Sequence, residues 1–218
     1  MIPLRDVIPS RTTPFVTVGI IVVNTILWLY EVSLPERDLT LLVHTYGVTP
    51  ASLQLSTLFS SMFLHGSWMH VIGNMWSLWI FGDNVEDRLG HNRFLVFYLL
   101  CGLGAGYGHV LAESSSIIPT IGASGAIAGV MGAYFVLYPH SRVLTLIPLI
   151  IYWEIVELPA ILVLGFWFVL QLLSGTMAAV DVGKGGGIAF MAHVAGFGLG
   201  AAGVYLFKKR QAPVEWFG

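Results

Sequence analysis

Charged side chains are scarce in this sequence. Only 10% of its 218 residues are Asp, Glu, Lys or Arg, whereas 56% are hydrophobic and the mean hydropathy is +0.80. Soluble domains carry about 25% charged residues. So few charges could not cover the surface of a water-soluble fold of this length. The composition therefore predicts a protein that folds in lipid.

Cysteine and excess basic charge are also missing, and each absence excludes a class of site. The single cysteine, Cys101, lies within an apolar run, so neither a disulfide nor a thiolate metal site is expected. The net charge is −2, without the clustered Lys and Arg that nucleic-acid binding requires. We therefore expect no nucleic-acid partner, no metal and no other cofactor.

Long runs with almost no charge divide the chain into helices, each near the ~20 residues that a spanning helix requires. They predict six spans, at residues 14–31, 66–82, 94–112, 124–138, 158–179 and 187–207. Residues 143–153, between Arg142 and Glu154, are too short to cross. No internal repeat or second domain is visible. We expect one domain over residues 1–218, an all-α polytopic membrane protein built as a six-transmembrane-helix bundle.

Basic residues predict the orientation of these helices, because Lys and Arg collect in cytoplasmic loops. With the N-terminus inside, the inner segments hold Arg5, Arg11, Arg88, Arg93, Arg142, Lys208, Lys209 and Arg210. The outer segments hold only Arg37 and Lys184. This distribution predicts that both termini are cytoplasmic. The first helix is too long for the apolar region of a signal peptide.

Polar groups inside membrane helices are candidates for function, and four of them are singled out by their spacing and depth. His70 and Asn74 are four residues apart and share one face of the helix at 66–82. Ser124 lies at the start of the fourth helix, and His193 lies near the start of the sixth. Helices two, four and six all run from outside to inside. The four residues should therefore lie at a similar depth, just below the outer surface.

Small residues predict contact between the fourth and sixth helices. Ser124 is followed on its face by small residues, and His193 is followed on its face by Gly196 and Gly200. Small residues let helix backbones approach closely in lipid. We therefore expect the two helices to touch, which would bring Ser124 and His193 within hydrogen-bond reach.

The motifs around these residues resemble those of the rhomboid family of intramembrane serine proteases, in its prokaryotic type. They are HGSWMHVIGNMWSLWIFGDNVEDRLG at 65–90, GASGAIAGVMGAY at 122–134, VELPAILVLGFWFVLQLLSG at 156–175 and AHVAGFGLG at 192–200. The resemblance covers essentially the whole chain. Gly-x-Ser-Gly alone is a weak motif. It becomes specific because His-x-x-x-Asn precedes it and Ala-His-x-x-Gly follows it, in order and at one depth.

The resemblance implies an intramembrane serine endopeptidase that cuts single-span or multi-span membrane proteins in or near their transmembrane segments, close to the outer face. Ser124 would be the nucleophile, and His193 its general base and later the general acid. The resemblance assigns oxyanion stabilisation to His70 and Asn74, together with the backbone N–H of Ser124. The protein is then expected in a prokaryotic inner membrane.

Supporting positions follow from the same motifs. By resemblance, His65 is a structural hydrogen-bonding residue near the site. Gly122 and Gly125 are expected to permit a tight backbone around the nucleophile. Residues 39–64 match a first loop that is partly membrane-embedded and shields the site from lipid. The fifth helix would be a lateral gate for substrate.

Carboxylates are not expected in the outer half of any spanning helix, so the pattern predicts a Ser-His dyad rather than a triad. The imidazole of His193 must then be oriented by packing or by a neutral group. Trp167 and Phe168 on the fifth helix are interpreted as lipid-facing or protein-facing bulk. Glu86 and Arg88 are interpreted as a solvated cluster in an inner loop.

Structural alternatives stay open for each site residue. Most serines in membrane helices bond a carbonyl one turn back, and His70 with Asn74 would also suit a polar face that joins helices. Two other functions are open as well. An inactive relative that binds membrane clients would be marked by loss of Ser124 or His193, which are both present. A transporter, haem or proton-relay protein would use His65, His70, His109 and His193, and bound haem would colour the purified protein.

Overall fold

A computed structural model of the chain describes residues 1–148, 152–180 and 190–208. Its helices are α1 (Phe15–Ser33), α2 (Glu36–Tyr46), α3 (Thr57–Ser60), α4 (Trp68–Leu89), α5 (His91–Ala112), α6 (Ser124–Leu137), α7 (Ala160–Val180) and α8 (Phe190–Phe207), with short 3-10 turns η1 (Pro50–Ser52) and η2 (Ser61–Phe63). The strands are β1 (Ile2–Asp6), β2 (Arg142–Pro148) and β3 (Trp153–Pro159). Lys184, Lys209, Arg210 and the first residues of the predicted span at 187–207 lie outside the described residues.

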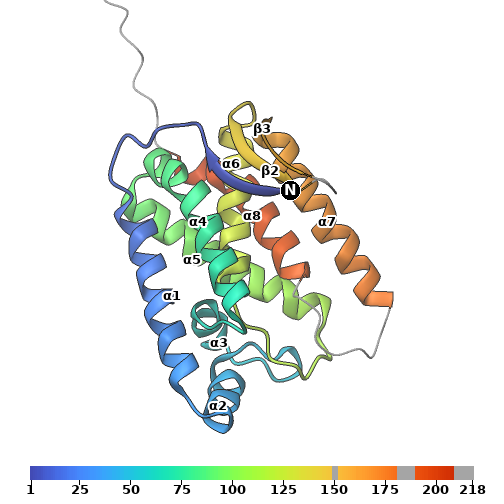
Figure 1. Cartoon of the computed structure of the whole chain (residues 1–218). Helices are drawn as coiled ribbons and strands as arrows, with labels where there is room; N and C mark the ends of the chain where they lie inside the picture. The colour runs from blue at the N-terminus through green and yellow to red at the C-terminus, as the bar shows by residue number, and fades with distance from the viewer. Residues whose placement is uncertain (149–151, 181–189, 209–218) are drawn as a thin grey trace, which may run out of the picture.

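Helix α6 stands in the centre of the bundle, in contact with α4, α5 and α8 (Figure 1). Every residue from Gly125 to Tyr134 is buried. A helix that is surrounded on all sides must be apolar on all sides, and the sequence between these two residues contains no polar side chain. Outside this centre, α1 packs against α4, and α7 packs against α8.

Three helices of the described chain, α1, α5 and α8, are long and apolar enough to cross a membrane by length and composition. Helix α6 and residues 160–173 of α7 form shorter apolar helices. Helix α4 runs to Leu89, well beyond the predicted span at 66–82. The prediction of a helical polytopic membrane protein is confirmed, while the count of six spans stays a prediction.

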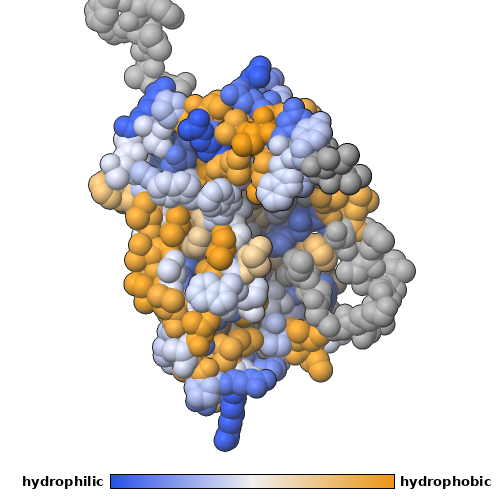
Figure 2. Space-filling model, viewed as in Figure 1, coloured by the Kyte–Doolittle hydropathy of each residue, from blue (hydrophilic) through white to orange (hydrophobic). Residues whose placement is uncertain are grey.

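Apolar side chains on α1 point away from the bundle. Phe15, Ile26 and Leu29 are 68%, 60% and 53% exposed. Figure 2 shows hydrophobic surface along this flank and hydrophilic side chains at both ends of the molecule. In water such a surface would be an aggregation liability, whereas in a bilayer it faces hydrocarbon.

Helices α6 and α8 approach until their backbones touch. A Cβ atom added to Gly200 would overlap the backbone of Gly129, and one added to Gly196 would overlap the carbonyl group of Gly125. Only glycine fits at this crossing, which is the small-residue packing that lipid favours. The predicted contact between the fourth and sixth helices is therefore present, and it holds Ser124 and His193 side by side.

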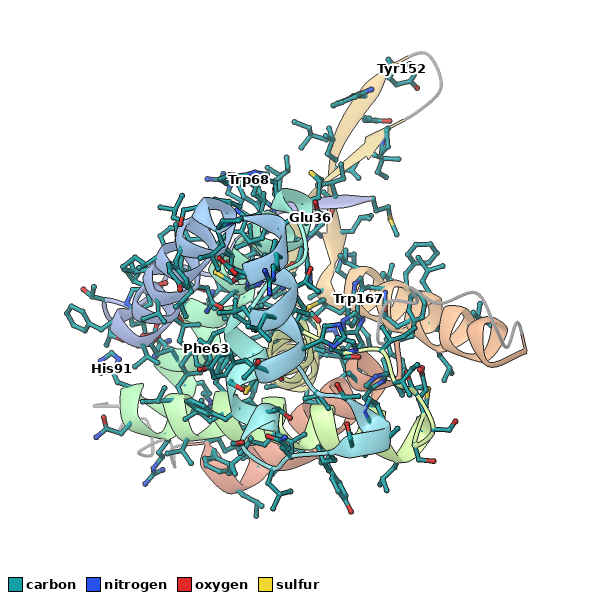
Figure 3. All side chains as sticks on the ribbon, turned by 90° about the horizontal axis from the view of Figure 1, so that it is seen from below. Glu36, Phe63, Trp68, His91, Tyr152 and Trp167 are labelled. Atoms are coloured by element: carbon teal, nitrogen blue, oxygen red, sulfur yellow. The ribbon has the colours of Figure 1, made fainter. Side chains whose placement is uncertain are left out.

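A three-stranded antiparallel sheet in the order β1-β2-β3 lies at one end of the bundle, which we call the sheet end (Figure 1). β2 and β3 pair from Arg142–Pro159 to Pro148–Trp153, and β1 joins them through Ile2–Leu146. Seen from the opposite end, the β2–β3 hairpin projects beyond the helices, with Tyr152 near its tip (Figure 3). Residues 143–153 were expected only to be too short to span the membrane, and no strand was predicted there.

Asp6 ties this sheet to the bundle. Its Oδ2 accepts hydrogen bonds from Asn84 Nδ2 at 2.8 Å and from the Tyr134 hydroxyl at 2.7 Å. Burial raises the pKa of Asp6 to about 6; the Tyr134 hydrogen bond opposes this shift and the charge of Asp83 adds to it. Trp76 also donates to the carbonyl of Pro3 at 2.7 Å.

Glu86, in the last turns of α4, holds the start of α1. Its carboxylate accepts the backbone N–H groups of Val16 at 3.0 Å and Thr17 at 2.8 Å, and the Thr17 hydroxyl at 2.7 Å. The first N–H groups of a helix have no acceptor within the helix, and the N-cap of α1, Pro14, supplies none. Glu86 is completely buried. Its interpretation as part of a solvated loop cluster is therefore wrong.

Candidate active site

Ser124 is the first residue of α6, and the segment before it is held on both sides. Val48, in the predicted first loop, and Thr120 exchange backbone hydrogen bonds of 2.9 and 2.8 Å. The carbonyl of Ser61 accepts the N–H of Gly122 at 2.8 Å. Gly122 has a φ of +133°, which L side chains rarely adopt. The first loop therefore fixes the turn that presents Ser124 at a helix N-terminus.

His193 lies in the first turns of α8 and is 8% exposed. Its Nε2 is 2.7 Å from Ser124 Oγ. This distance is that of a good hydrogen bond, so the hydroxyl has a ring nitrogen as partner. The structure thus brings together the two residues that the sequence analysis paired.

His70 and Asn74 approach the same point from α4, whose N-terminus is capped by the Ser67 hydroxyl accepting His70 N–H at 3.2 Å. A Cβ atom on Gly122 would lie 2.7 Å from His70 Nε2, so the ring rests directly on the turn before Ser124. Asn74 is 7% exposed, and its Nδ2 finds no acceptor among the described residues. A buried donor left unpaired is costly, so its role needs a reason.

A cavity of about 790 Å³ joins these groups. Its lining includes Ser124, His193, His70 and Asn74, together with residues of the first loop and of α5, α7 and α8. The cavity is large enough for several waters and for part of an extended peptide. Polar side chains that face such a space are accessible to a substrate.

His65 lies just outside this group. Its ring packs against His70 with 5.1 Å between centroids, and neither ring nitrogen has a partner among the described residues. Its backbone N–H donates to the carboxylate of Glu31 at 3.1 Å. Glu31 is completely buried near the end of α1. The expectation that no carboxylate lies in the outer half of a helix is therefore wrong at Glu31, although this carboxylate bonds His65 and not His193.

Gly125 was expected to permit a tight backbone around the nucleophile, and its surroundings point to helix packing. A Cβ atom there would lie 2.7 Å from the Cβ of Ala105 on α5. The residue is in regular helix, within α6. Its hydrogen side chain thus lets α5 and α6 approach beside Ser124.

Two residues of α7 lie near His193, and one of them, Gln171, was not singled out from the sequence. Gln171 Oε1 is 2.7 Å from His193 Nδ1. The Trp167 ring lies 5.8 Å from the imidazole, tilted by 38°, so the interpretation of this residue as bulk was incomplete. Gln171 is an isolated amide in an apolar run, and that isolation was the available signal in the sequence.

The arrangement contains a hydroxyl, a ring nitrogen that can take its proton, and neutral donors beside it. Among the described residues, no three His, Cys, Asp or Glu side chains converge as metal ligands. The chemistry that these groups can perform by themselves is proton transfer and nucleophilic attack by oxygen.

A family model and several known proteins that resemble this chain all point to the same family. A family model described as "Rhomboid domain" matches residues 52–210. RHOMBOID-like protein 5 of Arabidopsis thaliana is 33% identical over 145 residues, which are 66% of this chain and 42% of that protein. The putative rhomboid protease YdcA of Bacillus subtilis is 32% identical over 127 residues, 57% of this chain and 62% of that protein.

Rhomboid protein 1, mitochondrial, of Saccharomyces cerevisiae is 32% identical over 92 residues, 40% of this chain and 27% of that protein. The chain thus matches between 27% and 62% of the length of these three relatives. The domain match covers most of the present chain, from within the first loop to the end of α8. This integral membrane protein therefore belongs to the rhomboid family.

Proposed function

We propose that the protein is an intramembrane serine endopeptidase that hydrolyses peptide bonds in or near the transmembrane segments of membrane proteins. Membership of the rhomboid family supports intramembrane protease activity. The observation that carries the proposal is the 2.7 Å contact between Ser124 Oγ and His193 Nε2, in a cavity between membrane helices. A Ser-His pair in this contact is the minimal device for acyl transfer.

Acylation begins when Ser124 Oγ attacks the carbonyl carbon of the scissile peptide bond. The hydroxyl proton passes to His193 Nε2, and the electron pair of the carbonyl π bond moves to its oxygen. When the carbonyl re-forms, the C–N bond breaks and the imidazolium gives its proton to the leaving amine. The products of this step are an ester on Ser124 and a free amine.

The negative oxygen of the tetrahedral intermediate needs donors that are already in place. Asn74 lines the cavity, and its buried Nδ2 has no acceptor among the described residues. An unpaired donor is costly in the resting protein, but it gains an acceptor when charge develops on the substrate oxygen. The N–H of Ser124, at the start of α6, and the ring of His70 are the other two donors of the proposed oxyanion hole.

Water hydrolyses the ester through the same groups. His193 Nε2 takes a proton from a water molecule in the cavity, and the resulting oxygen attacks the ester carbon. The C–O bond to Ser124 breaks, and the proton returns to Ser124 Oγ. The cavity supplies the space for this water, which hydrocarbon would exclude.

Substrates are membrane proteins with one or several spans. The peptide bonds of a spanning helix are hydrogen-bonded within that helix, so a local stretch must unwind before attack. Residues 1–218 would form one domain of six spans with both termini cytoplasmic, in a prokaryotic inner membrane, which places the dyad near the outer face. A tag on the N-terminus that is reachable only from outside the cell would contradict this orientation.

Labelling with a fluorophosphonate tests the proposal. The purified protein should become modified at Ser124 and should cleave a model transmembrane substrate. Ser124→Ala should abolish labelling and cleavage, and His193→Ala should reduce both by about 10⁴-fold or more, the scale for removal of a catalytic base. Labelling that persists in Ser124→Ala at equal protein level would overturn the assignment.

A further inference from the structure

A neutral amide occupies the place where a triad would have its carboxylate. Gln171 Oε1 on α7 is 2.7 Å from His193 Nδ1, on the side of the ring opposite Ser124. Gln171 is half-buried and also lines the cavity. Among the described residues no carboxylate forms an ion pair with His193. The imidazole is thus held between a hydroxyl and an amide.

Chemistry decides which atom of the amide must face the ring. When His193 takes the proton of Ser124, both ring nitrogens carry hydrogen, so Nδ1–H needs an acceptor. The amide oxygen is an acceptor, whereas the amide nitrogen is only a donor. With Oε1 toward Nδ1, the proton of the neutral ring is also kept on Nδ1, and Nε2 is left free to accept from Ser124.

Trp167 supports the same ring from its face. It lies four residues before Gln171, so both side chains project from one face of α7. Its ring is 5.8 Å from the imidazole and is also in contact with Phe197 on α8, at 6.2 Å between centroids. In Figure 3, Trp167 lies on the side of α7 that faces the bundle. One face of α7 therefore limits both the tilt and the rotation of the imidazole.

From this geometry we propose that Gln171 is a positioning residue. Its amide oxygen fixes the tautomer and orientation of His193 and accepts the Nδ1–H of the imidazolium during proton transfer. This inference rests on the proposed function of Ser124 and His193, and it assigns to α7 a direct part in the chemistry. The site then operates as Ser124–His193–Gln171, with an uncharged third member suited to a low-dielectric surrounding.

Two substitutions of similar size separate hydrogen bonding from packing. Gln171→Met removes the acceptor, whereas Gln171→Glu keeps an acceptor oxygen at the same distance from the backbone. We expect Gln171→Met to lower kcat by about 10–10³-fold, between the loss of an outer orienting group and the loss of a triad carboxylate. The KM should stay near that of the parent. Gln171→Glu should retain most of the parental kcat, and the fluorophosphonate labelling rate should follow kcat.

Leu172→Met is the matched control, because it places the same side chain at the neighbouring, exposed position of α7. It should leave kcat unchanged. Parental kcat in a folded Gln171→Met variant would overturn the inference, and so would equal losses in Gln171→Met and Gln171→Glu. Both results differ from failure of the proposed function, in which the parent protein itself neither labels at Ser124 nor cleaves.

The ¹⁵N chemical shifts of the His193 ring test the inference without any turnover. The signals are assigned by comparison with His193→Ala. The parent should show the tautomer protonated at Nδ1, and Gln171→Met should show a mixture of tautomers. An unchanged tautomer in Gln171→Met would contradict the positioning role even in a protein that hydrolyses nothing.

Discussion

The cavity end of the molecule, around Ser124 and His193, and the sheet end, around Glu86 and Asp6, both bury polar side chains among apolar helices. At the sheet end the groups are carboxylates, and their oxygens accept hydrogen bonds from backbone N–H groups, hydroxyls and amides. At the cavity end the groups that meet the cavity are neutral, and Asn74 Nδ2 has no acceptor among the described residues.

The difference shows what marks a site in a membrane protein. Burial of a carboxyl group alone does not, because Glu86 is completely buried and its oxygens are taken up by the start of α1 and by His91 Nδ1 at 2.5 Å. An unpaired hydrogen-bond donor or acceptor on a residue that lines a cavity does mark a site, because such a group gains its partner when a ligand binds. The comparison predicts that substitutions at the cavity end change turnover, whereas substitutions at the sheet end change stability.

Outside the Ser124–His193 pair itself, the largest effect that compares the two ends is expected at Asn74. Asn74→Ala should lower kcat by about 10²–10³-fold, the scale for removal of one oxyanion donor. The KM should change little, because an oxyanion contact strengthens in the transition state. Thermal stability should also change little, since Nδ2 has no hydrogen bond to lose.

Ser77→Ala is the control for Asn74→Ala, because Ser77 lies one turn further along α4 and lines the same cavity. Its kcat should stay near that of the parent. Unfolding of Asn74→Ala, or an unchanged kcat, would show that the polar face of α4 serves helix packing, and the proposed contrast between the two ends would not hold.

Glu86 should show the opposite behaviour. Glu86→Gln keeps the shape of the side chain but turns one acceptor oxygen into a donor that faces the N–H groups of Val16 or Thr17. The free energy of unfolding should fall by about 1.5–3 kcal/mol, the range for a hydrogen bond to a charged group. Unfolding in mixed micelles measures this loss.

The kcat of the folded Glu86→Gln protein should match that of the parent, because Glu86 and its partners Val16 and Thr17 do not line the cavity. Glu157→Gln is the matched control. Glu157 is exposed on β3 and pairs with Arg142 at 3.8 Å, a surface contact worth at most about 1 kcal/mol. Equal stability losses in the two variants would show that the cap on α1 contributes no more than a surface pair.

The sequence predicted the cavity end more fully than the sheet end. Helix periodicity and the depth argument placed His70, Asn74, Ser124 and His193 at one level, and the glycines of α8 predicted the contact with α6 that brings the pair together. These signals are local to single helices. The role of Gln171 was not predicted, because its contact with His193 depends on how α7 packs on α8. No sequence pattern within α7 encodes this packing.

The sheet end was missed for a related reason. β1 pairs with β2 although the two strands are far apart in the sequence, as Ile2 and Leu146 show. Such a pairing leaves little trace in the hydrophobic pattern of either strand. Charges at Arg142 and Glu154 only indicated that the segment between them does not cross the membrane. In the sequence Glu86 resembles a loop residue. Its hydrogen bonds go to the start of α1, which is far away along the chain.

The smallest effect is expected at Asp6. The fold raises the pKa of this carboxyl to about 6 from 3.8, chiefly through burial, so folding favours its protonated form. The contribution is most favourable below pH 4 and is lost as the pH rises through 6. Because Asp6 is only partly buried, solvent screening keeps the change to less than about 1 kcal/mol.

Asp6→Asn should remove this dependence, because the amide does not ionise and its oxygen still accepts from Tyr134. The melting temperature of the parent, compared at pH 5 and pH 8, should fall with rising pH more than that of Asp6→Asn. Asp38→Asn, at an exposed position of α2, serves as the control and should behave as the parent. Identical pH slopes in the parent and Asp6→Asn would mean that Asp6 ionises as freely in the fold as in the unfolded chain. The sheet would then be held to the bundle by its packing and by neutral contacts such as that of Trp76 with Pro3.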